Sequence, residues 1–251
     1  MNSKRAMGET QDAYGRLVLD LHEGRPAVEM VERDDGYLQA NRGPLQYFEP
    51  IRRWGEAERR AMRLVRGRVL DIGCGPGRVS LHLEARGHEV VGIDVSPLAV
   101  RVARARGARD ARVLAIEDVD SGLGQFQTVV MFGNNFGLLR SRTAAPRLLR
   151  RLRRVTTKDA RILAASLDVY RTDNPAHLAY QERNRARRRM SGQIRLRIRH
   201  LQYATPWFDY LMVSPAEMAE LAAAGGWRLE RTIGDGPIYV GVLARTAAAT
   251  R

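Results

Sequence analysis

The chain has 251 residues, of which 44% are hydrophobic, and this is enough for one large α/β domain with a sizeable core. It has no uncharged apolar run of 18 residues or more, which argues against a membrane span, and its charged first thirty residues argue against a secretory signal. The single cysteine excludes an internal disulfide and a cysteine-based zinc site. We therefore expect a cytoplasmic globular protein without a bound metal.

The formal net charge is +14, and every basic residue except Lys4 and Lys158 is an arginine. Together with the many alanines, this bias is typical of a GC-rich genome. A charge of this size raises the concentration of anions at the surface, but it does not by itself establish a nucleic-acid partner.

The pattern of residues 14–66 is mostly helical, with interruptions near residues 34–36 and 43–44. Within residues 47–65, apolar side chains recur at spacings of three, four and seven, which predicts a buried helical stripe. We expect this N-terminal part, residues 1–66, to form a helical cover. The polar end at residues 1–11 and the tail at residues 247–251 are expected to be loose.

After Gly67 the pattern changes to short apolar runs that alternate with helical segments. Five such runs predict parallel strands at residues 68–72, 89–94, 111–116, 128–132 and 161–167. Two closing strands are predicted at residues 227–233 and 239–243. This alternation indicates a doubly wound sheet with helices on both faces.

Residues 168–213 interrupt the alternation and predict an inserted lid. A helix is expected at residues 175–190, followed by a strand at residues 194–201 that could pair with residues 207–213 as a hairpin. Eight arginines lie in this region: Arg183, Arg185, Arg187, Arg188, Arg189, Arg195, Arg197 and Arg199. A solvated surface, an acidic substrate and a nucleic-acid backbone each remain open as explanations of this charge.

The sharpest motif is a glycine-rich turn, Asp71-Ile72-Gly73-Cys74-Gly75-Pro76-Gly77, between the first strand and its helix. Glycines there let the backbone approach a ligand closely, and the carboxyl end of such a strand borders a binding crevice. Asp94 ends the next strand, where an acidic side chain can accept hydrogen bonds from ribose hydroxyls. The combination predicts a site for a ligand that contains a nucleoside.

Residues that are absent from the turn argue against two classes of nucleotide ligand, dinucleotides and nucleoside triphosphates. A dinucleotide fingerprint requires a glycine where Arg78 stands, and the chain has no Gly-Lys-Ser or Gly-Lys-Thr phosphate loop. Asp71 would repel a pyrophosphate but suits a cationic amino group. S-adenosylmethionine carries an ammonium group, a ribose and a positive sulfonium, so it fits both aspartates.

Residues 68–167 resemble the cofactor-binding half of class I S-adenosylmethionine-dependent methyltransferases. Residues 71–77 match the first motif of that family, and Val91-Gly92-Ile93-Asp94 matches its second motif. The resemblance implies a Rossmann-like, seven-stranded, mostly parallel doubly wound sheet. It divides the chain into the helical cover at 1–66, a cofactor-binding core at 67–167, the lid at 168–213, and a C-terminal helix with closing strands at 214–251.

The same resemblance implies that S-adenosylmethionine is the cofactor and S-adenosylhomocysteine the product. The glycine turn would hold the methionine end, Asp71 the amino group and Asp94 both ribose hydroxyls. Glu117 and Asp118 fall where the family contacts adenine. The full set of predicted cofactor residues is Asp71, Gly73, Cys74, Gly75, Gly77, Asp94, Val95, Glu117, Asp118, Phe132 and Asn134.

The acceptor side is predicted less directly. Residues 133–137 follow the fourth strand but lack the Pro-Pro pair that nucleobase N-methyltransferases of this class usually carry there. We expect methyl transfer to an oxygen or nitrogen of a small molecule, acidic or natural-product-like. An RNA-modifying enzyme and a non-catalytic cofactor-binding module are the alternatives. Predicted catalytic residues are His177, Tyr180 and Tyr210, and predicted acceptor contacts are Tyr47, Asn135 and Trp207.

Overall fold

The structure, a computed structural model, describes residues 7–40 and 43–246, so the terminal segments expected to be loose lie partly outside the described residues. The contacts divide the chain into two compact units. Unit 1 comprises residues 1–54, 70–118 and 194–209, and unit 2 comprises residues 55–69, 119–193 and 210–251. Each unit is therefore assembled from three separate chain segments.

A seven-stranded sheet with the strand order β11-β12-β7-β6-β3-β4-β5 forms the framework of the fold. The strands are β3 (Val69–Ile72), β4 (Val90–Asp94), β5 (Ala111–Val113), β6 (Phe126–Met131), β7 (Thr156–Leu167), β11 (Trp227–Ile233) and β12 (Ile238–Arg245). β4 pairs with β5 and β6 with β7 in parallel, whereas β12 is antiparallel to both β7 and β11. The predicted mostly parallel, seven-stranded α/β fold is confirmed.

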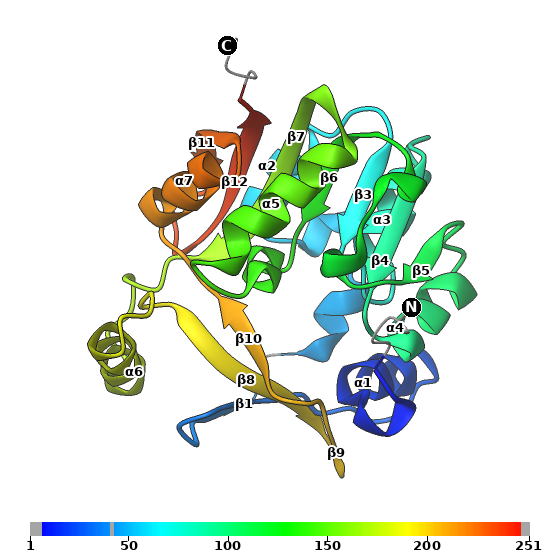
Figure 1. The fold of residues 1–251 in the computed structure, drawn as a ribbon. Coiled ribbons are helices and arrows are strands. Elements are labelled where there is room, and N and C mark those ends of the chain that lie inside the picture. The colour runs from blue at the N-terminus through cyan, green and yellow to red at the C-terminus, as the bar shows by residue number, and fades with distance from the viewer. Residues whose placement is uncertain (1–6, 41–42, 247–251) are drawn as a thin grey trace, which may run out of the picture. The chain divides into compact units, whose positions relative to one another are not determined.

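The described residues of unit 1 form the α-helices α1 (Ala13–His22), α3 (Arg78–Glu84) and α4 (Pro97–Ala105). Short 3-10 helices occupy Glu9–Gln11, Pro44–Phe48, Ile51–Arg53 and Ile116–Asp118. α1 lies beside α4, with Val18 and Leu19 packed against Leu98 and Val102 (Figure 1). This apolar contact fixes the N-terminal helix next to the helix that follows β4.

A second sheet has the strand order β10-β8-β1-β2. Its strands are β1 (Met30–Arg33), β2 (Leu38–Ala40), β8 (Gln193–His200), β9 (Tyr203–Ala204), which pairs with β8, and β10 (Phe208–Leu211). β8 pairs antiparallel with β1, with Arg199 opposite Met30 and Leu196 opposite Arg33 (Figure 1). The strand predicted in the lid thus joins an N-terminal hairpin that the sequence did not suggest.

The N-terminal part expected to be mostly helical, with an interruption near residues 34–36, thus also contains two strands around that interruption. β1 and β2 form a hairpin across a turn in which Gly36 has φ +86°, a conformation that favours glycine. The predicted long helix at residues 47–65 is also interrupted. Pro50 and Gly55 both have extended ψ angles and precede a 3-10 helix and α2 (Glu56–Met62), so the stripe is divided between short elements.

Unit 2 contains α2, α5 (Ala144–Arg154), α6 (Pro175–Ala186) and α7 (Pro215–Ala224), with 3-10 helices at Ser121–Leu123 and Asn135–Leu139. α7 starts with a capping box, in which the Ser214 and Glu217 side chains satisfy each other's backbone N–H groups. It packs on one face of β12, where Met218 lies against Gly241. Among the described residues, no helix has the length and apolar character needed to cross a bilayer.

Candidate cofactor and acceptor site

The glycine turn at the end of β3 has the geometry that its sequence predicts. Gly73, Gly75 and Gly77 have φ angles of +72°, +52° and +84°, which side chains with a Cβ rarely adopt. The backbone N–H groups of Gly73 and Cys74 donate to the Ile93 carbonyl, so the turn is anchored to β4. Buried Cys74 packs under Gly92, and burial raises the pKa of its thiol, which opposes a nucleophilic role.

Two aspartates stand at the ends of β3 and β4. Asp71 is 2% exposed and accepts a hydrogen bond from the Ser80 hydroxyl at 2.7 Å. Asp94 accepts one bond from the Gly75 N–H and one from the Ser96 N–H, both at 2.9 Å. Burial raises the pKa of each carboxyl group to about 6, because water no longer solvates the charged form.

Tyr14 of α1 closes over the glycine turn. A Cβ placed on Gly75 would meet the Tyr14 hydroxyl at 2.5 Å, so glycine is required here by space as well as by φ. Burial raises the pKa of Tyr14 well above its usual range, and nearby Tyr47, Asp94 and Glu29 raise it further. These influences show that the two tyrosines and two carboxyl groups lie close together within unit 1.

A hydrogen-bonded pair, Tyr47 with Glu29, adjoins this tyrosine. The Tyr47 hydroxyl is 3.0 Å from each carboxylate oxygen of Glu29, which is 2% exposed. The Tyr47 ring meets the Tyr14 ring edge-on, with centroids 5.3 Å apart. Tyr47, predicted as an acceptor contact, is therefore linked through Tyr14 to the glycine turn. Sequence reasoning missed Tyr14 and Glu29, because neither belongs to a recognisable pattern.

Asp12 was also missed, although it holds this arrangement together. Its carboxylate is fully buried and accepts bonds from Gly15 N–H at 2.8 Å, Ser96 hydroxyl at 2.8 Å and Leu98 N–H at 3.1 Å. One side chain thus caps α1 and ties it to the first turn of α4. An aspartate before an amphipathic helix is a recognisable N-cap signal, so the role of Asp12 in α1 could be predicted. Its bonds to Ser96 and Leu98 could not, because they depend on how α1 packs on α4.

Four predicted residues lie in unit 2, near the end of β6. Phe132 is buried, and Asn134 has a positive φ of +68°. The Asn134 side-chain oxygen is buried and has no hydrogen-bond partner among the described residues, a feature that suits a ligand contact. Tyr210 donates to the Asn134 carbonyl at 2.7 Å, and its ring lies against Gly137. Asn135 begins the following 3-10 helix.

The remaining predicted residues have varied surroundings. His177 and Tyr180 both lie on α6; the His177 ring is 3.3 Å from the Thr172 hydroxyl, and buried Tyr180 is covered by Arg183. In unit 1, Glu117 and Asp118 end a 3-10 helix that follows β5. Three half-exposed or exposed positions complete the set: Val95, Trp207 and Tyr47.

The arginines of β8 have carboxylate partners within unit 1. Arg197 binds Glu32 with two nitrogens, at 2.7 and 3.1 Å, and stacks on Trp207. Arg199 reaches the same carboxylate at 3.0 Å, and Arg195 lies 3.6 Å from Asp209. The three arginines of β8 therefore already bind carboxylates of the protein itself. This argues against the hypothesis that they hold an acidic substrate.

His200, at the end of β8, is likewise a structural residue. It is 1% exposed, with one ring nitrogen 2.7 Å from Asp20 and the other 3.0 Å from the Val28 carbonyl. Asp20 belongs to α1, so this contact attaches β8 to the helix that carries Tyr14.

The residues of the site fit the groups of S-adenosylmethionine. Asp71 and Asp94 are carboxylates whose charged forms are disfavoured by burial, and a ligand cation would compensate for that cost. Asp94 also accepts from backbone N–H groups at the strand end, where a ribose hydroxyl can add a further bond. The positive-φ glycines leave the backbone open to close approach.

Known proteins share both the sequence region and the fold. Residues 69–159 match the family model of a methyltransferase domain. A ubiquinone biosynthesis O-methyltransferase of Xylella fastidiosa is 38% identical over 81 residues, 30% of this chain and 32% of the relative. A 2-heptyl-1-hydroxyquinolin-4(1H)-one methyltransferase of Mycobacteroides abscessus is 46% identical over 44 residues, 18% and 19% of the two chains. The chain thus spans a third or less of the length of these curated relatives.

The similarity to one solved structure extends over nearly the whole chain. A SAM-dependent methyltransferase of Bacteroides fragilis, solved in complex with S-adenosyl-L-homocysteine, has a TM-score of 0.82. The alignment covers 97% of this chain and 98% of the other at 24% identity, so it establishes a shared fold. The matched region also contains the glycine turn and both strand-end aspartates, so residues 69–159 belong to the methyltransferase-domain family, and the chain as a whole shares the fold of a solved S-adenosylmethionine-dependent methyltransferase.

Proposed function

We propose that this protein transfers a methyl group from S-adenosylmethionine to an oxygen or nitrogen of a small-molecule acceptor. The observation that carries the proposal is the glycine turn between two strand-end carboxyl groups, buried Asp71 and partly buried Asp94, both with a raised pKa. When bound, S-adenosylmethionine supplies a methyl group on a positive sulfonium, and such a transfer depends mainly on alignment and exclusion of water.

The chain's own residues would hold the donor in three ways. Asp71 would orient the amino group, Asp94 would accept from the ribose hydroxyls, and the backbone of residues 73–77 would lie along the methionine part. Tyr14 would cover this turn from α1, because its hydroxyl already lies against Gly75. The raised pKa of Tyr14 keeps that hydroxyl protonated, so it acts as a hydrogen-bond donor at neutral pH.

The pair of Tyr47 and Glu29 would serve the acceptor. Tyr47 is half-buried, while the Glu29 carboxylate behind it is shielded from water. As the methyl group bonds to an acceptor oxygen, that oxygen would lose its proton to the Tyr47 hydroxyl oxygen. The Tyr47 proton would pass to Glu29 at the same time, so no charge accumulates on the tyrosine. Tyr47 is thus the candidate catalytic residue and Glu29 its positioning partner.

The acceptor class is supported by two observations. The segment after β6, Gly133-Asn134-Asn135-Phe136-Gly137, lacks the Pro-Pro pair of nucleobase N-methyltransferases. The relatives named above are called methyltransferases of ubiquinone biosynthesis and of a hydroxyquinolone, and both names point to small molecules. An RNA acceptor is favoured only by the net charge of +14.

The first test is transfer of labelled methyl from S-adenosylmethionine into a fractionated extract of the source cells. We expect label in the small-molecule fraction and none when the Asp94→Asn variant replaces the wild-type protein. Label in RNA would replace the proposed acceptor with a nucleic acid. Failure to bind S-adenosylhomocysteine in calorimetry would refute the cofactor assignment itself.

A further inference from the structure

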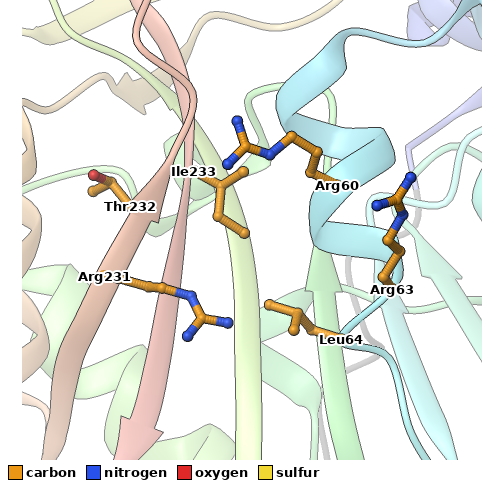
Figure 2. A pocket seen from close by; sticks show the side chains of 6 residues that line it. All are labelled: Arg60, Arg63, Leu64, Arg231, Thr232 and Ile233. Carbon is orange, nitrogen blue, oxygen red and sulfur yellow. The ribbon is translucent and has the colours of Figure 1, made fainter.

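A hollow lies between α2 and the edge strand β11, both of which belong to unit 2. It has a volume of about 430 Å³ and is lined by Arg60, Arg63, Leu64, Arg231, Thr232 and Ile233 (Figure 2). Figure 2 shows Arg60 and Arg231 extending from the helix and the strand into the space between them. None of the lining residues belongs to the glycine turn or to the cofactor, catalytic and acceptor residues predicted from the sequence.

A β-bulge turns the strand side of this hollow toward α2. Leu229 pairs with Leu243, but Arg231 pairs with Val242 and Ile233 with Val240, so Glu230 is an extra residue in β11. Cross-strand partners share a face of the sheet, and adjacent positions on β12 face opposite sides. Arg231 and Ile233 therefore lie on the face opposite Leu229.

Without the bulge, simple alternation would put Leu229, Arg231 and Ile233 on one face, the face covered by α7. The extra residue instead directs the arginine and the isoleucine to the α2 side. Bulges at sheet edges often re-aim a side chain next to a functional site. The position of Arg231 on this face is therefore a consequence of a specific backbone feature, and the arginine-rich composition of the chain does not explain it.

The charges in the hollow are poorly compensated. Arg60 of α2 and Arg63, which directly follows this helix, are three residues apart, a like-charge arrangement that destabilises the end of a helix. Within the described ranges, neither Arg63 nor Arg231 has an ion-pair partner, and Arg60 has only exposed Glu56 at 3.7 Å. By contrast, Arg228 on the same strand lies 3.4 Å from Glu230.

The surface between the arginines is apolar. Ile233 is buried and Leu64 is half-buried, and both lie between the guanidinium-bearing side chains (Figure 2). A ligand that fills the hollow would thus combine an anionic end with a small apolar body. The guanidinium groups of Arg60 and Arg231 suit a phosphate, which carries up to two charges and several acceptor oxygens, better than a single carboxylate.

We propose that the hollow between α2 and β11 binds the phosphate group of a compact phosphorylated organic molecule. The bulge at Glu230 supplies Arg231, and α2 supplies Arg60, and these two side chains together hold the phosphate over Leu64 and Ile233. The volume suits a body of about the size of one aromatic ring or nucleoside. This site is independent of the proposed methyl transfer, because it shares no residue with the donor or acceptor groups.

The test uses phenyl phosphate as the probe and the full-length protein. In calorimetry we expect saturable binding that is weakened about tenfold or more by Arg231→Gln and by Arg60→Gln, since each loses a charged hydrogen bond. Arg228→Gln is the matched control, an exposed arginine of β11 outside the hollow, and should bind as the wild type does. Methyl NMR signals of Ile233 and Leu64 should shift on titration of the unmodified protein.

Three results would overturn the proposal. Phenyl phosphate could leave the Ile233 and Leu64 signals unmoved, or bind equally well to the Arg231→Gln and Arg228→Gln variants. Alternatively, single-stranded RNA could bind in a manner that depends on Arg60 and Arg231 while phenyl phosphate does not, which would make the hollow a nucleic-acid contact. Inorganic phosphate alone should bind more weakly than phenyl phosphate if the apolar floor contributes.

Discussion

Unit 1 of this strongly basic protein contains several acidic side chains that are shielded from water. The chain carries a net charge of +14, yet Asp12, Glu29 and Asp71 are each 2% exposed or less, and Asp94 is also largely desolvated. Buried acids require partners, and Asp12 has three donors of its own. Asp71 and Asp94 keep a raised pKa despite their bonds, so they are the acids for which a ligand cation matters most.

We predict that both stability and cofactor binding respond to pH through these two aspartates. The pKa of each rises from 3.8 to about 6 on folding, so the folded chain holds protons that the unfolded chain releases. Without cofactor, stability should therefore fall as the pH rises from about 4 to about 6, whereas affinity for the cationic donor should increase over the same range.

Urea unfolding and calorimetry with S-adenosylmethionine at pH 5 and 7 would measure the two effects. The Asp94→Asn variant removes one titrating group, so its pH dependence should be shallower and its affinity at pH 7 about tenfold or more weaker. A wild-type affinity that is unchanged between pH 5 and 7 would contradict the assignment of Asp71 and Asp94 as the groups that meet the ligand.

A second prediction at this scale concerns Tyr47. Tyr47→Phe removes the hydroxyl that contacts Glu29 but preserves the ring that meets Tyr14. We expect kcat to fall by about 10²-fold or more, with little change in the affinity for S-adenosylhomocysteine. Glu29→Gln should produce a similar loss and shift the pH profile of kcat. Equal activity of Tyr47→Phe and wild type would exclude the proton relay.

The elements of the fold differ in how far the sequence predicts them. The strand, glycine turn and helix at residues 69–84 follow from local signals: an apolar run, glycines with positive φ and a helical stripe. β1 does not, because its stability depends on pairing with β8, more than 160 residues later in the chain. The position of Glu29, just before β1, could not be predicted for the same reason. The position of Tyr14 depends on the packing of α1 against α4, which is also a contact between distant segments.

At the element scale we predict that Asp12→Ala destabilises the protein by about 2 kcal/mol, since α1 loses its N-cap and the buried Leu98 N–H of α4 loses its acceptor, each worth about 1 kcal/mol. Because α1 then loses its attachment to α4, Tyr14 should also leave Gly75, and cofactor affinity should fall. Denaturant titration and calorimetry would measure both. Asp35→Ala, at an acid in the β1–β2 hairpin turn, is a control that should leave cofactor affinity unchanged.

At the scale of the whole molecule, the two units alternate along the chain. The boundaries fall at residues 54/55, 69/70, 118/119, 193/194 and 209/210, and three of them lie within strands, namely β3, β8 and β10. Forming only part of a strand is costly, because its hydrogen bonds are made in a continuous ladder. These three strands each contain residues assigned to both units.

We accordingly predict a single cooperative unfolding transition. The three tryptophans allow a direct measurement, because Trp54 and Trp207 belong to unit 1 and fully buried Trp227 to unit 2. Fluorescence of the Trp227→Phe variant and of a variant that retains only Trp227 should give coincident urea transitions. Transitions separated along the denaturant axis would indicate that the units unfold independently.

The pairing of β1 with β8 also sets an order of events during translation. β1 is synthesised before β8, and Arg199, the partner of Met30, is added 169 residues after it. At bacterial or eukaryotic synthesis rates this interval is on the order of ten seconds or more. Throughout it, one edge of the nascent β1–β2 hairpin lacks its neighbour, and an unpaired edge invites association with other chains. The late arrival of β8 therefore makes this hairpin the segment of the growing chain most in need of protection by a chaperone.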